Sequence, residues 1–333
     1  MQYMEPTSQE IRMRKDLVQR FTKLIASFNM NVSVQPVGSY VTGLYLPTSD
    51  IDMVLTCQHG LQDLIPMYGL MERIRKSGFA SKVVDVLRAS VPLIRITDKI
   101  TGIEIDLTAK TTEHAIRATE AVQKWLQRSS PAKPLLFVVK MFLLIRRCGT
   151  TYTGGINSYV LFWMVVAWVK LEMPKNKTMA NSADDIPSLI TAFGRLSTSK
   201  SSEGVDLGEL LVKFLKFYGE EFDYCQKAID IEPTPAYCTK IYGYSRYRIT
   251  EHYLLSICDP ADITIDMGSK AYGIKHIQES FKEAYRSLTQ LEAKRKSGQR
   301  MGEAGVLGSV LGGDWRILEK RRDAWKSHGI PTC

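Results

Sequence analysis

Residues 37–55 read VGSYVTGLYLPTSDIDMVL and combine a Gly-Ser turn with two carboxylates at the start of an apolar strand. Gly38 and Ser39 can offer backbone N–H groups and a hydroxyl to phosphate oxygens, because the first-turn donors of a helix have no partner within it. Asp50 and Asp52 lie two residues apart, so on a strand their side chains point to the same face. Two convergent carboxylates suit a hard cation such as Mg²⁺. The segment therefore predicts nucleotide phosphates and a divalent metal held side by side.

A third carboxylate lies on a predicted β-hairpin further along the chain. Residues 91–97 and 103–108 alternate apolar and polar side chains on either side of a polar turn. In the second of these strands Asp106 lies on the polar face, where it could join Asp50 and Asp52 on one side of a sheet. Such a trio is what a two-metal site for phosphoryl transfer needs. Taken singly these signals are weak, since an isolated Asp-x-Asp is most often a turn or surface loop; their combination is what favours the metal site.

The order of predicted elements describes an α+β chain. Apolar residues at helical spacing predict a first helix at 8–28, and a second helix is predicted at 61–77. Period-two alternation predicts strands at 32–37, 51–56, 83–88, 91–97 and 103–108. From residue 113 onward the periodicity is helical, with helices expected at 135–147, 157–172, 210–222 and 277–291. A small mixed sheet therefore precedes a mainly helical part.

Composition narrows the class of protein. The chain has 333 residues and a formal net charge of +9, which suits a polyanionic partner without establishing one. The six cysteines include no Cys-x-x-Cys and no pairing with His at zinc spacing, so inert thiols in a reducing compartment are expected. No secretory signal is recognisable, and the most apolar run, 159–169, is too short for a membrane span of about 20 residues.

Two further segments carry a resemblance to a known family. Residues 37–55 resemble the signature of polymerase-β-type nucleotidyltransferases, specifically the non-canonical poly(A) polymerase and terminal uridylyltransferase family. Residues 153–159, TGGINSY, resemble that family's nucleotide-recognition loop, and residues 259–268, DPADITIDMG, resemble its late base-recognition motif. The resemblance implies an α+β fold with a polymerase-β-like palm at 30–120, a mainly helical central domain made of 1–29 and 121–292, and a basic, glycine-rich, flexible tail at 293–333.

The resemblance also implies roles for the acidic residues of the first domain. Asp50, Asp52 and Asp106 would be catalytic and would hold two Mg²⁺ or Mn²⁺ ions, while Gly38 and Ser39 would bind the nucleotide. In the family the third carboxylate is nearest the attacking oxygen, so Asp106 would act on an RNA 3′-hydroxyl that attacks the α-phosphorus in line. Such enzymes need no template, because protein groups read the base.

The second domain supplies further nucleotide-binding candidates. Ser158 opens a predicted helix whose N-terminus suits phosphate, and Tyr159 could stack on a base or could equally be a core residue. Lys140 lies in an otherwise apolar helix, where a lysine is costly unless it snorkels or meets an anion. The resemblance implies that this anion is the nucleotide triphosphate. In the late motif the candidates are Asp259, Asp262 and Asp266.

Several positions in the sequence indicate which base the protein selects. Uridylyl-specific members of the family commonly place a histidine a few residues after the Asp-Pro of the late motif, and poly(A)-adding members an asparagine; this chain has Ile265 there. Residues 42–50 and 153–156 resemble the nuclear, exosome-linked poly(A)-adding branch, and Ala118 stands where uridylyl enzymes commonly carry an asparagine. We therefore expect ATP as substrate, with a terminal uridylyltransferase using UTP as the alternative.

The sequence contains no recognisable RNA-binding module. The poly(A)-adding branch commonly borrows RNA binding from a zinc-knuckle protein and works beside an RNA helicase, so the resemblance implies both as partners besides ATP and an RNA 3′ end. An inactive nucleotidyltransferase-fold scaffold is an alternative that the intact set of three aspartates disfavours. Transfer to a small acceptor or a protein is another, which the second-domain segments disfavour. The nucleus or the cytoplasm is the expected location, without a membrane.

Overall fold

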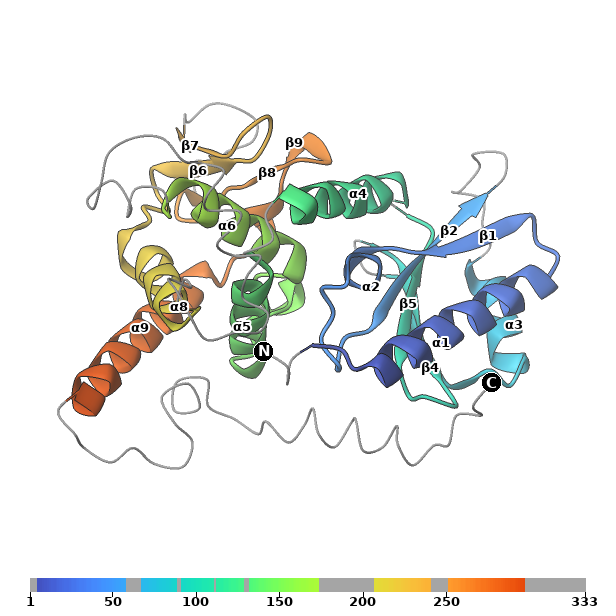
Figure 1. Cartoon of the computed structure of the whole chain (residues 1–333). Coiled ribbons are helices and arrows are strands. Elements are labelled where there is room, and N and C mark those ends of the chain that lie inside the picture. The colour runs from blue at the N-terminus through green and yellow to red at the C-terminus, as the bar shows by residue number, and fades with distance from the viewer. Residues whose placement is uncertain are drawn as a thin grey trace. The chain divides into compact units, whose positions relative to one another are not determined.

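The computed structural model describes residues 5–57, 67–88, 91–110, 112–128, 132–173, 207–240 and 251–296. Within these residues the chain forms two compact units, one up to residue 123 and the other from residue 124 onward. Each unit is described by itself below (Figure 1). In the described ranges no helix is both long and apolar enough to span a membrane.

The first unit is built on a five-stranded sheet with strand order β1-β2-β5-β4-β3. Strand β2 pairs parallel with β5, and the other neighbouring strands pair antiparallel. Four helices belong to this part of the chain: α1 (Ser8–Ser27), α2 (Gly38–Thr42), α3 (Met67–Lys76) and α4 (Thr112–Arg128), the last of which runs past the division at residue 123. The strands are β1 (Val32–Pro36), β2 (Ile51–Cys57), β3 (Ala80–Val86), β4 (Leu93–Asp98) and β5 (Glu104–Thr108).

One face of this sheet carries the hydrophobic core of the first unit. Apolar side chains of β2, β4 and β5 are buried there together with apolar residues of α1 and α3. Because side chains alternate along a strand, Asp52, Arg95 and Asp106 lie on the opposite face from their buried neighbours. The alternation that places the core therefore also separates the acidic residues from it.

Helix α1 belongs to the first unit. It begins with a capping box in which Thr7 and Glu10 bond each other's backbone N–H groups. Its buried apolar residues recur at helical spacing and join the core of the sheet: Met13, Leu17, Phe21 and Ile25. The expectation that residues 1–29 belong with the helical central domain is therefore wrong for α1, because its apolar residues pack against those of the strands in the first unit.

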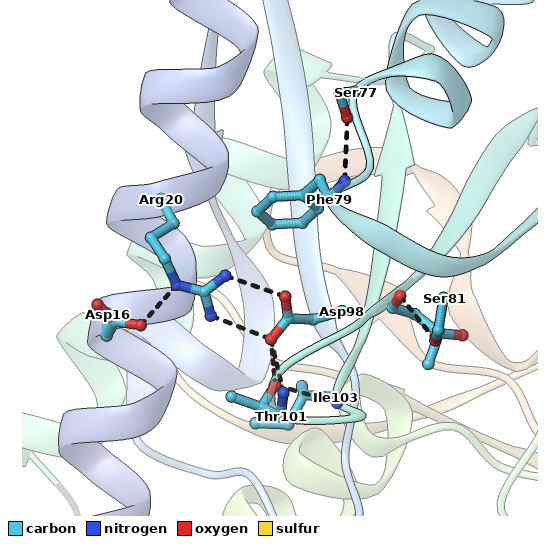
Figure 2. Close-up of polar contacts among 9 residues, drawn as sticks. Asp16, Arg20, Ser77, Phe79, Ser81, Asp98, Thr101 and Ile103 are labelled. Atoms are coloured by element: carbon cyan, nitrogen blue, oxygen red, sulfur yellow. Dashed lines mark hydrogen bonds and ion pairs between the residues drawn. The ribbon is translucent and has the colours of Figure 1, made fainter. Parts of the chain in front are cut away.

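A buried ion pair fastens α1 to the turn between β4 and β5. Figure 2 shows the guanidinium of Arg20 donating to both carboxylate oxygens of Asp98, at 3.0 Å each. Asp98 also accepts from the backbone N–H and the hydroxyl of Thr101, at 2.8 and 2.7 Å. Burial by itself raises the pKa of Asp98, but the bonds from Arg20 and Thr101 outweigh it and hold that pKa below its ordinary value.

The second unit combines helices with two short hairpins (Figure 1). Its longer helices are α5 (Ala132–Ile145), α6 (Ser158–Leu171), α8 (Leu207–Lys216) and α9 (Ile274–Lys296). Helix α6 is almost wholly buried, which explains its unbroken apolar sequence. The hairpins pair β6 (Lys227–Asp230) with β7 (Ala236–Thr239) and β8 (Cys258–Asp259) with β9 (Asp262–Asp266).

Buried Lys240 links, through hydrogen bonds, the chain segments that flank the two hairpins. Its ammonium group donates to the backbone carbonyls of Tyr224, His252 and Leu254, at 2.5, 2.9 and 2.6 Å. The last two residues lead into β8, so this contact helps to hold the segment that carries Asp259.

The predicted strands of the first unit are all present, with ends displaced by up to three residues. The strands of the second unit were not predicted, because they are only two to five residues long, which is too short for a periodic pattern to stand out. The predicted helix at 61–77 is described only from Met67, and most of the predicted tail at 293–333 lies outside the described residues.

Candidate active site

The Gly-Ser turn lies directly against the second aspartate. Gly38 opens α2 with φ of 65°, a left-handed conformation that L side chains rarely adopt. A Cβ at this position would lie 3.0 Å from Oδ2 of Asp52. The Val37 N–H donates to the backbone carbonyl of Asp52 at 2.9 Å, which fixes the turn to the strand. Glycine is required here both by the backbone angle and by the carboxylate beside it.

Helix α4 binds the same turn from another side. The Gly38 N–H donates to the Thr119 hydroxyl at 2.8 Å, and that hydroxyl donates to the Ala115 carbonyl at 2.7 Å. This differs from the sequence-based expectation, in which the Gly38 N–H is available to phosphate. In the structure that donor is used within the protein, and phosphate binding by Ser39 stays a prediction.

Strand pairing brings the second and third aspartates together. Asp52 on β2 and Asp106 on β5 are directly paired residues of the parallel ladder, and Asp106 is paired on its other side with Arg95 of β4. Directly paired residues project their side chains to the same face of the sheet. Asp50 precedes Asp52 by two residues, just before β2 begins.

Arg95 forms a two-point ion pair with Asp106. Its Nε lies 2.7 Å from Oδ1 and its Nη2 lies 2.6 Å from Oδ2. Glu104 is more distant, with its Oε2 3.9 Å from Arg95 Nε. The bonds to Asp106, and further the charges of Glu104 and Asp50, raise the pKa of Arg95 above its ordinary value. One guanidinium therefore interacts with three carboxylates on this face of the sheet.

Arg14 of α1 holds the loop that leads into β2. Its guanidinium is buried and donates to the carbonyls of Ser49 at 2.6 Å and Pro47 at 3.2 Å, with longer contacts to Leu46 and Asp50 at 3.5 and 3.4 Å. It also lies over the ring of Tyr45, 4.6 Å from the centroid. A single side chain thus fixes the backbone on the N-terminal side of the acidic residues.

The acidic residues fit a divalent cation by their chemistry. Asp52 and Asp106 on two paired strands, with Asp50 just before the first of them, supply the oxygen ligands that Mg²⁺ and Mn²⁺ prefer. Across the ranges that the structure covers, no three His, Cys, Asp or Glu side chains are arranged to hold a metal ion as they stand. Both oxygens of Asp106 are bonded to Arg95, so a cation taking Asp106 as ligand has to compete with that guanidinium.

In the second unit the structure joins Tyr159 to Asp259. The Tyr159 hydroxyl donates to Oδ1 of Asp259 at 2.8 Å, and the same oxygen accepts the Ala261 N–H at 2.8 Å. Asp259 is 1% exposed, and the Tyr159 ring meets Trp163 edge to face. Burial, followed by the charge of Asp259, raises the pKa of Tyr159, so its hydroxyl stays protonated at neutral pH.

The other candidates of this unit have different surroundings. Ser158 is the first residue of α6, after the Asn157 cap, which accepts the Val160 N–H at 2.9 Å. Asp262 accepts from the backbone and hydroxyl of Thr264. The remaining candidates are Lys140, half-buried on α5, and Asp266, which caps the turn at Met267–Lys270 and accepts the Ile257 N–H. Ile265, the position consulted for the choice of base, is exposed on β9.

Three residues that position the site were missed by sequence reasoning: Arg14, Arg95 and Thr119. Arg14 could have been suspected, because it interrupts the apolar stripe of its helix, where a charge needs a partner. Arg95 could have been found by extending the hairpin register, which pairs it with Asp106. The contact of Thr119 with Gly38 joins elements far apart in sequence and has no local signal.

Two family models match the sequence. One, described as the central palm domain of mitochondrial-like poly(A) RNA polymerase, matches residues 1–127, and the other, described as Cid1 family poly A polymerase, matches residues 206–264. Together they cover more than half of the chain. The chain belongs to the non-canonical poly(A) polymerase and terminal uridylyltransferase family. The first match covers the palm, and the second match lies in the second unit.

Curated relatives from this family match along nearly all of the chain. Poly(A) RNA polymerase protein 2 of Saccharomyces cerevisiae is 26% identical, over 98% of this chain and 52% of that protein. Poly(A) RNA polymerase cid14 of Schizosaccharomyces pombe is 28% identical, over 99% of this chain and 46% of that protein. The chain thus spans about half the length of these relatives. The Drosophila melanogaster protein Trf4-2, named an inactive non-canonical poly(A) RNA polymerase, is 27% identical over 87% of this chain and 66% of that protein.

Solved structures from the family share the fold. The polymerase core of TRAMP, described as an RNA surveillance complex, aligns with a TM-score of 0.75 and 26% identity, over 93% of this chain and 91% of that one. The Cid1 poly(U) polymerase aligns with a TM-score of 0.66 and 21% identity, over 86% of this chain and 91% of that one. The polymerase-β-like α+β fold expected from the sequence is confirmed.

Proposed function

We propose that this protein adds AMP from ATP to RNA 3′ ends without a template. The observation that carries the proposal is the pairing of Asp52 with Asp106 across two parallel strands, beside a glycine turn that packs on the Asp52 carboxylate. Membership of the family supports the reaction class. Curated relatives bear the name poly(A) RNA polymerase, which supports adenylate as the transferred group.

Asp50, Asp52 and Asp106 would hold two Mg²⁺ or Mn²⁺ ions in the active enzyme. When bound, these ions supply charge stabilisation at the phosphates and lower the pKa of the attacking hydroxyl. The Ser39 hydroxyl and backbone N–H would bind the triphosphate, and Gly38 would let it approach the strand. Asp106 would orient the RNA 3′-hydroxyl and take up its proton. Arg95 would have to loosen its bonds to Asp106 for that role.

The second unit would bind the nucleotide's base and phosphates. The Tyr159 ring is held by its hydroxyl bond to Asp259, and this fixed aromatic group would stack on the base. Ser158 at the start of α6 and Lys140 on α5 would contact the triphosphate. Asp262 and Asp266 would act on the base only through the β8–β9 hairpin, because both bond to the backbone of that region.

A uridylyltransferase is the second candidate within the enzyme class. Ile265 lacks the hydrogen-bonding groups that the family's late motif commonly supplies, so it supports neither base. An inactive scaffold is a candidate of another class, since the family contains a member named as inactive. The presence of Asp50, Asp52 and Asp106 in this chain argues against it.

We also propose that RNA delivery needs other proteins. A zinc-knuckle RNA-binding protein and an RNA helicase are the candidates, in the nucleus or the cytoplasm. The likeness to the polymerase core of TRAMP supports assembly into a complex.

An extension assay tests the proposed function. The full chain is incubated with labelled single-stranded RNA, Mg²⁺ and each of the four nucleoside triphosphates in turn. A ladder with ATP that disappears in the Asp50→Asn/Asp52→Asn variant is the expected result. A ladder with UTP alone would assign the chain to the uridylyl branch. No extension with any nucleotide, with and without a candidate zinc-knuckle protein, would favour the scaffold.

A further inference from the structure

A rigid loop in the second unit displays an almost fully exposed tyrosine. The loop contains a short turn, Thr151–Thr153, and its backbone bonds join Gly154 N to the Thr151 carbonyl at 3.1 Å and Gly155 N to the Thr150 carbonyl at 2.8 Å. Tyr152 lies at the centre of this turn and is 93% exposed. Its ring therefore contributes almost nothing to the core, although the backbone that carries it is fixed.

A second exposed tyrosine holds this loop in place. The Tyr272 hydroxyl donates to the Tyr152 carbonyl at 2.9 Å, and the Gly273 N–H donates to the Gly154 carbonyl at 2.9 Å. The Tyr272 ring packs so closely on Gly154 that a Cβ there would lie 2.4 Å from it. Tyr272 is nevertheless 59% exposed. Two aromatic residues far apart in sequence thus meet at one exposed surface.

The segments around these tyrosines carry positive charge. Neither residues 144–156 nor residues 267–278 contain an Asp or Glu. Exposed basic side chains follow the same segments: Arg147, Lys270 and Lys275. Arg147 is tied to the turn through its carbonyl, which accepts the Thr153 hydroxyl at 3.4 Å. The neighbouring Arg146 is left out of this set, because its guanidinium lies 3.8 Å from a Glu283 carboxylate oxygen.

We propose that Tyr152 and Tyr272, with Arg147, Lys270 and Lys275, form a docking surface for the single-stranded RNA acceptor. An exposed aromatic ring can stack on any base, and the cations can contact the phosphates between bases. The inference rests on the proposed function for the identity of the nucleic acid. It also gives this chain, which has no recognisable RNA-binding module, a surface of its own for the acceptor.

The position of the loop in the sequence supports this assignment. Residues 151–155 run directly into the Asn157 cap and the start of α6, where Ser158 and Tyr159 are the proposed nucleotide contacts. An acceptor bound at Tyr152 would thus lie on the segment that precedes the nucleotide-binding residues. Three exposed cations beside two exposed aromatic rings suit a polyanion with stacked bases better than an average protein partner, although Asp266 and Glu279 flank the second segment.

The RNA affinity of the Tyr152→Ala variant tests the proposed docking surface. Fluorescence anisotropy measures the affinity of the full chain for a labelled single-stranded RNA of mixed sequence, without nucleotide. We expect Tyr152→Ala to bind about fivefold to a hundredfold more weakly, as loss of a stacked base predicts, and Tyr152→Trp to bind like wild type. The matched control is Tyr68→Ala, since Tyr68 on α3 is also 59% exposed but belongs to the first unit.

The salt dependence of RNA affinity tests whether the basic residues contact phosphates. We expect the Lys270→Gln/Lys275→Gln double variant to flatten the plot of log affinity against log salt by about 0.7 for each phosphate that the protein no longer neutralises. Equal RNA affinity of Tyr152→Ala, Tyr68→Ala and wild type would overturn the proposal. So would failure of wild type to bind the RNA at low salt, or a Tyr152→Ala variant that loses only a protein partner.

The readouts also separate this surface from the proposed function. A wild-type chain that binds RNA through Tyr152 but extends it with no nucleotide would support the surface and contradict the adenylyltransferase. Extension of RNA that is equally efficient in Tyr152→Ala and wild type at RNA concentrations below saturation would support the enzyme and overturn the surface.

Discussion

Arg95 and Asp106 neutralise each other across neighbouring strands, at a position where the sequence predicts a metal-binding carboxylate. Both guanidinium contacts are short, 2.7 and 2.6 Å, and the two residues are directly paired in the β4–β5 ladder. Without such a cation, the carboxylates on this face of the sheet would repel one another. The arginine thus stabilises the metal-free site and competes with the ions that the site would bind.

Replacing Arg95 should therefore move metal affinity and stability in opposite directions. In Arg95→Met the carboxylate of Asp106 no longer has to leave a partner, so Mn²⁺ should bind severalfold more tightly. The metal-free protein should lose about 1 kcal/mol of unfolding free energy, a modest amount because Arg95 is 40% exposed. Mn²⁺ titration followed by electron paramagnetic resonance, and urea unfolding in EDTA, measure the two quantities. Weaker Mn²⁺ binding in the variant would contradict the competition.

Arg14 and Arg20, two of the three arginines of α1, provide a matched pair of variants. Arg14 bonds the loop before Asp50, whereas Arg20 bonds Asp98 at the β4–β5 turn. Both substitutions to Met should destabilise the fold, because each leaves buried acceptors without a charged donor, at a cost of about 2 to 3 kcal/mol. Only Arg14→Met should also weaken Mn²⁺ binding, by about tenfold to a hundredfold, as loss of a residue that orients metal ligands commonly does.

Equal loss of Mn²⁺ affinity in the Arg14→Met and Arg20→Met variants would show that the effect follows stability and not the position of the loop. The titrations are made at a temperature where both variants remain folded by circular dichroism.

Alanine variants at Gly38 and Gly43 distinguish the effect of backbone strain from the effect of crowding the Asp52 carboxylate. Both have a left-handed φ, 65° and 69°, so alanine should cost about 1 to 2 kcal/mol of stability at either position. The new Cβ at Gly38 would press on Asp52 at 3.0 Å, whereas nothing lies within 4 Å of a Cβ at Gly43. We expect Gly38→Ala to lose most of its RNA extension activity and Gly43→Ala to retain it. Similar activities in the two variants would dismiss the role assigned to this close approach.

Unfolding at acidic pH should reveal how much the Arg20–Asp98 ion pair contributes to stability. The pKa of Asp98 is held below its ordinary value by Arg20 and Thr101, so its stabilising effect is complete above about pH 4 and is lost as the pH falls through the lowered pKa. The difference in unfolding free energy between wild type and Asp98→Asn should therefore shrink between pH 5 and more acidic conditions. Urea unfolding at several pH values measures it. A difference that stays constant with pH would contradict the assignment.

The sequence was sufficient for the parts of this site that follow from local pattern. Alternation along 103–108 put Asp106 on the polar face, and the pairing of β5 with β2 places it opposite Asp52. The roles of these aspartates in metal binding stay predictions. Periodicity also located α1, but not the surface that it covers, because an amphipathic helix does not specify its partner.

The contacts that periodicity could not predict join residues that are far apart in the sequence. Thr119 and Gly38 meet only because α4 passes the turn, and Tyr152 and Tyr272 meet because the segment just before α9 folds back on the loop before α6. Hydrogen bonds between residues about 80 and 120 positions apart leave no pattern in a single sequence. Such contacts depend on tertiary packing, which a local pattern does not encode.

The bond between Tyr159 and Asp259 allows the ring and the hydroxyl to be tested separately. Tyr159→Ala removes the ring, and loss of base stacking predicts a KM for ATP about fivefold to a hundredfold higher in the extension assay. Tyr159→Phe keeps the ring but leaves Asp259, which is 1% exposed, with fewer donors, so a smaller rise in KM and a loss of about 1 to 3 kcal/mol in stability are expected. Asp259→Asn keeps an acceptor oxygen for the Tyr159 hydroxyl and should resemble wild type more than Tyr159→Phe does. If Tyr159→Phe and Tyr159→Ala raise KM equally, the hydroxyl and not the stacked ring determines ATP binding, and Tyr159 acts by positioning Asp259.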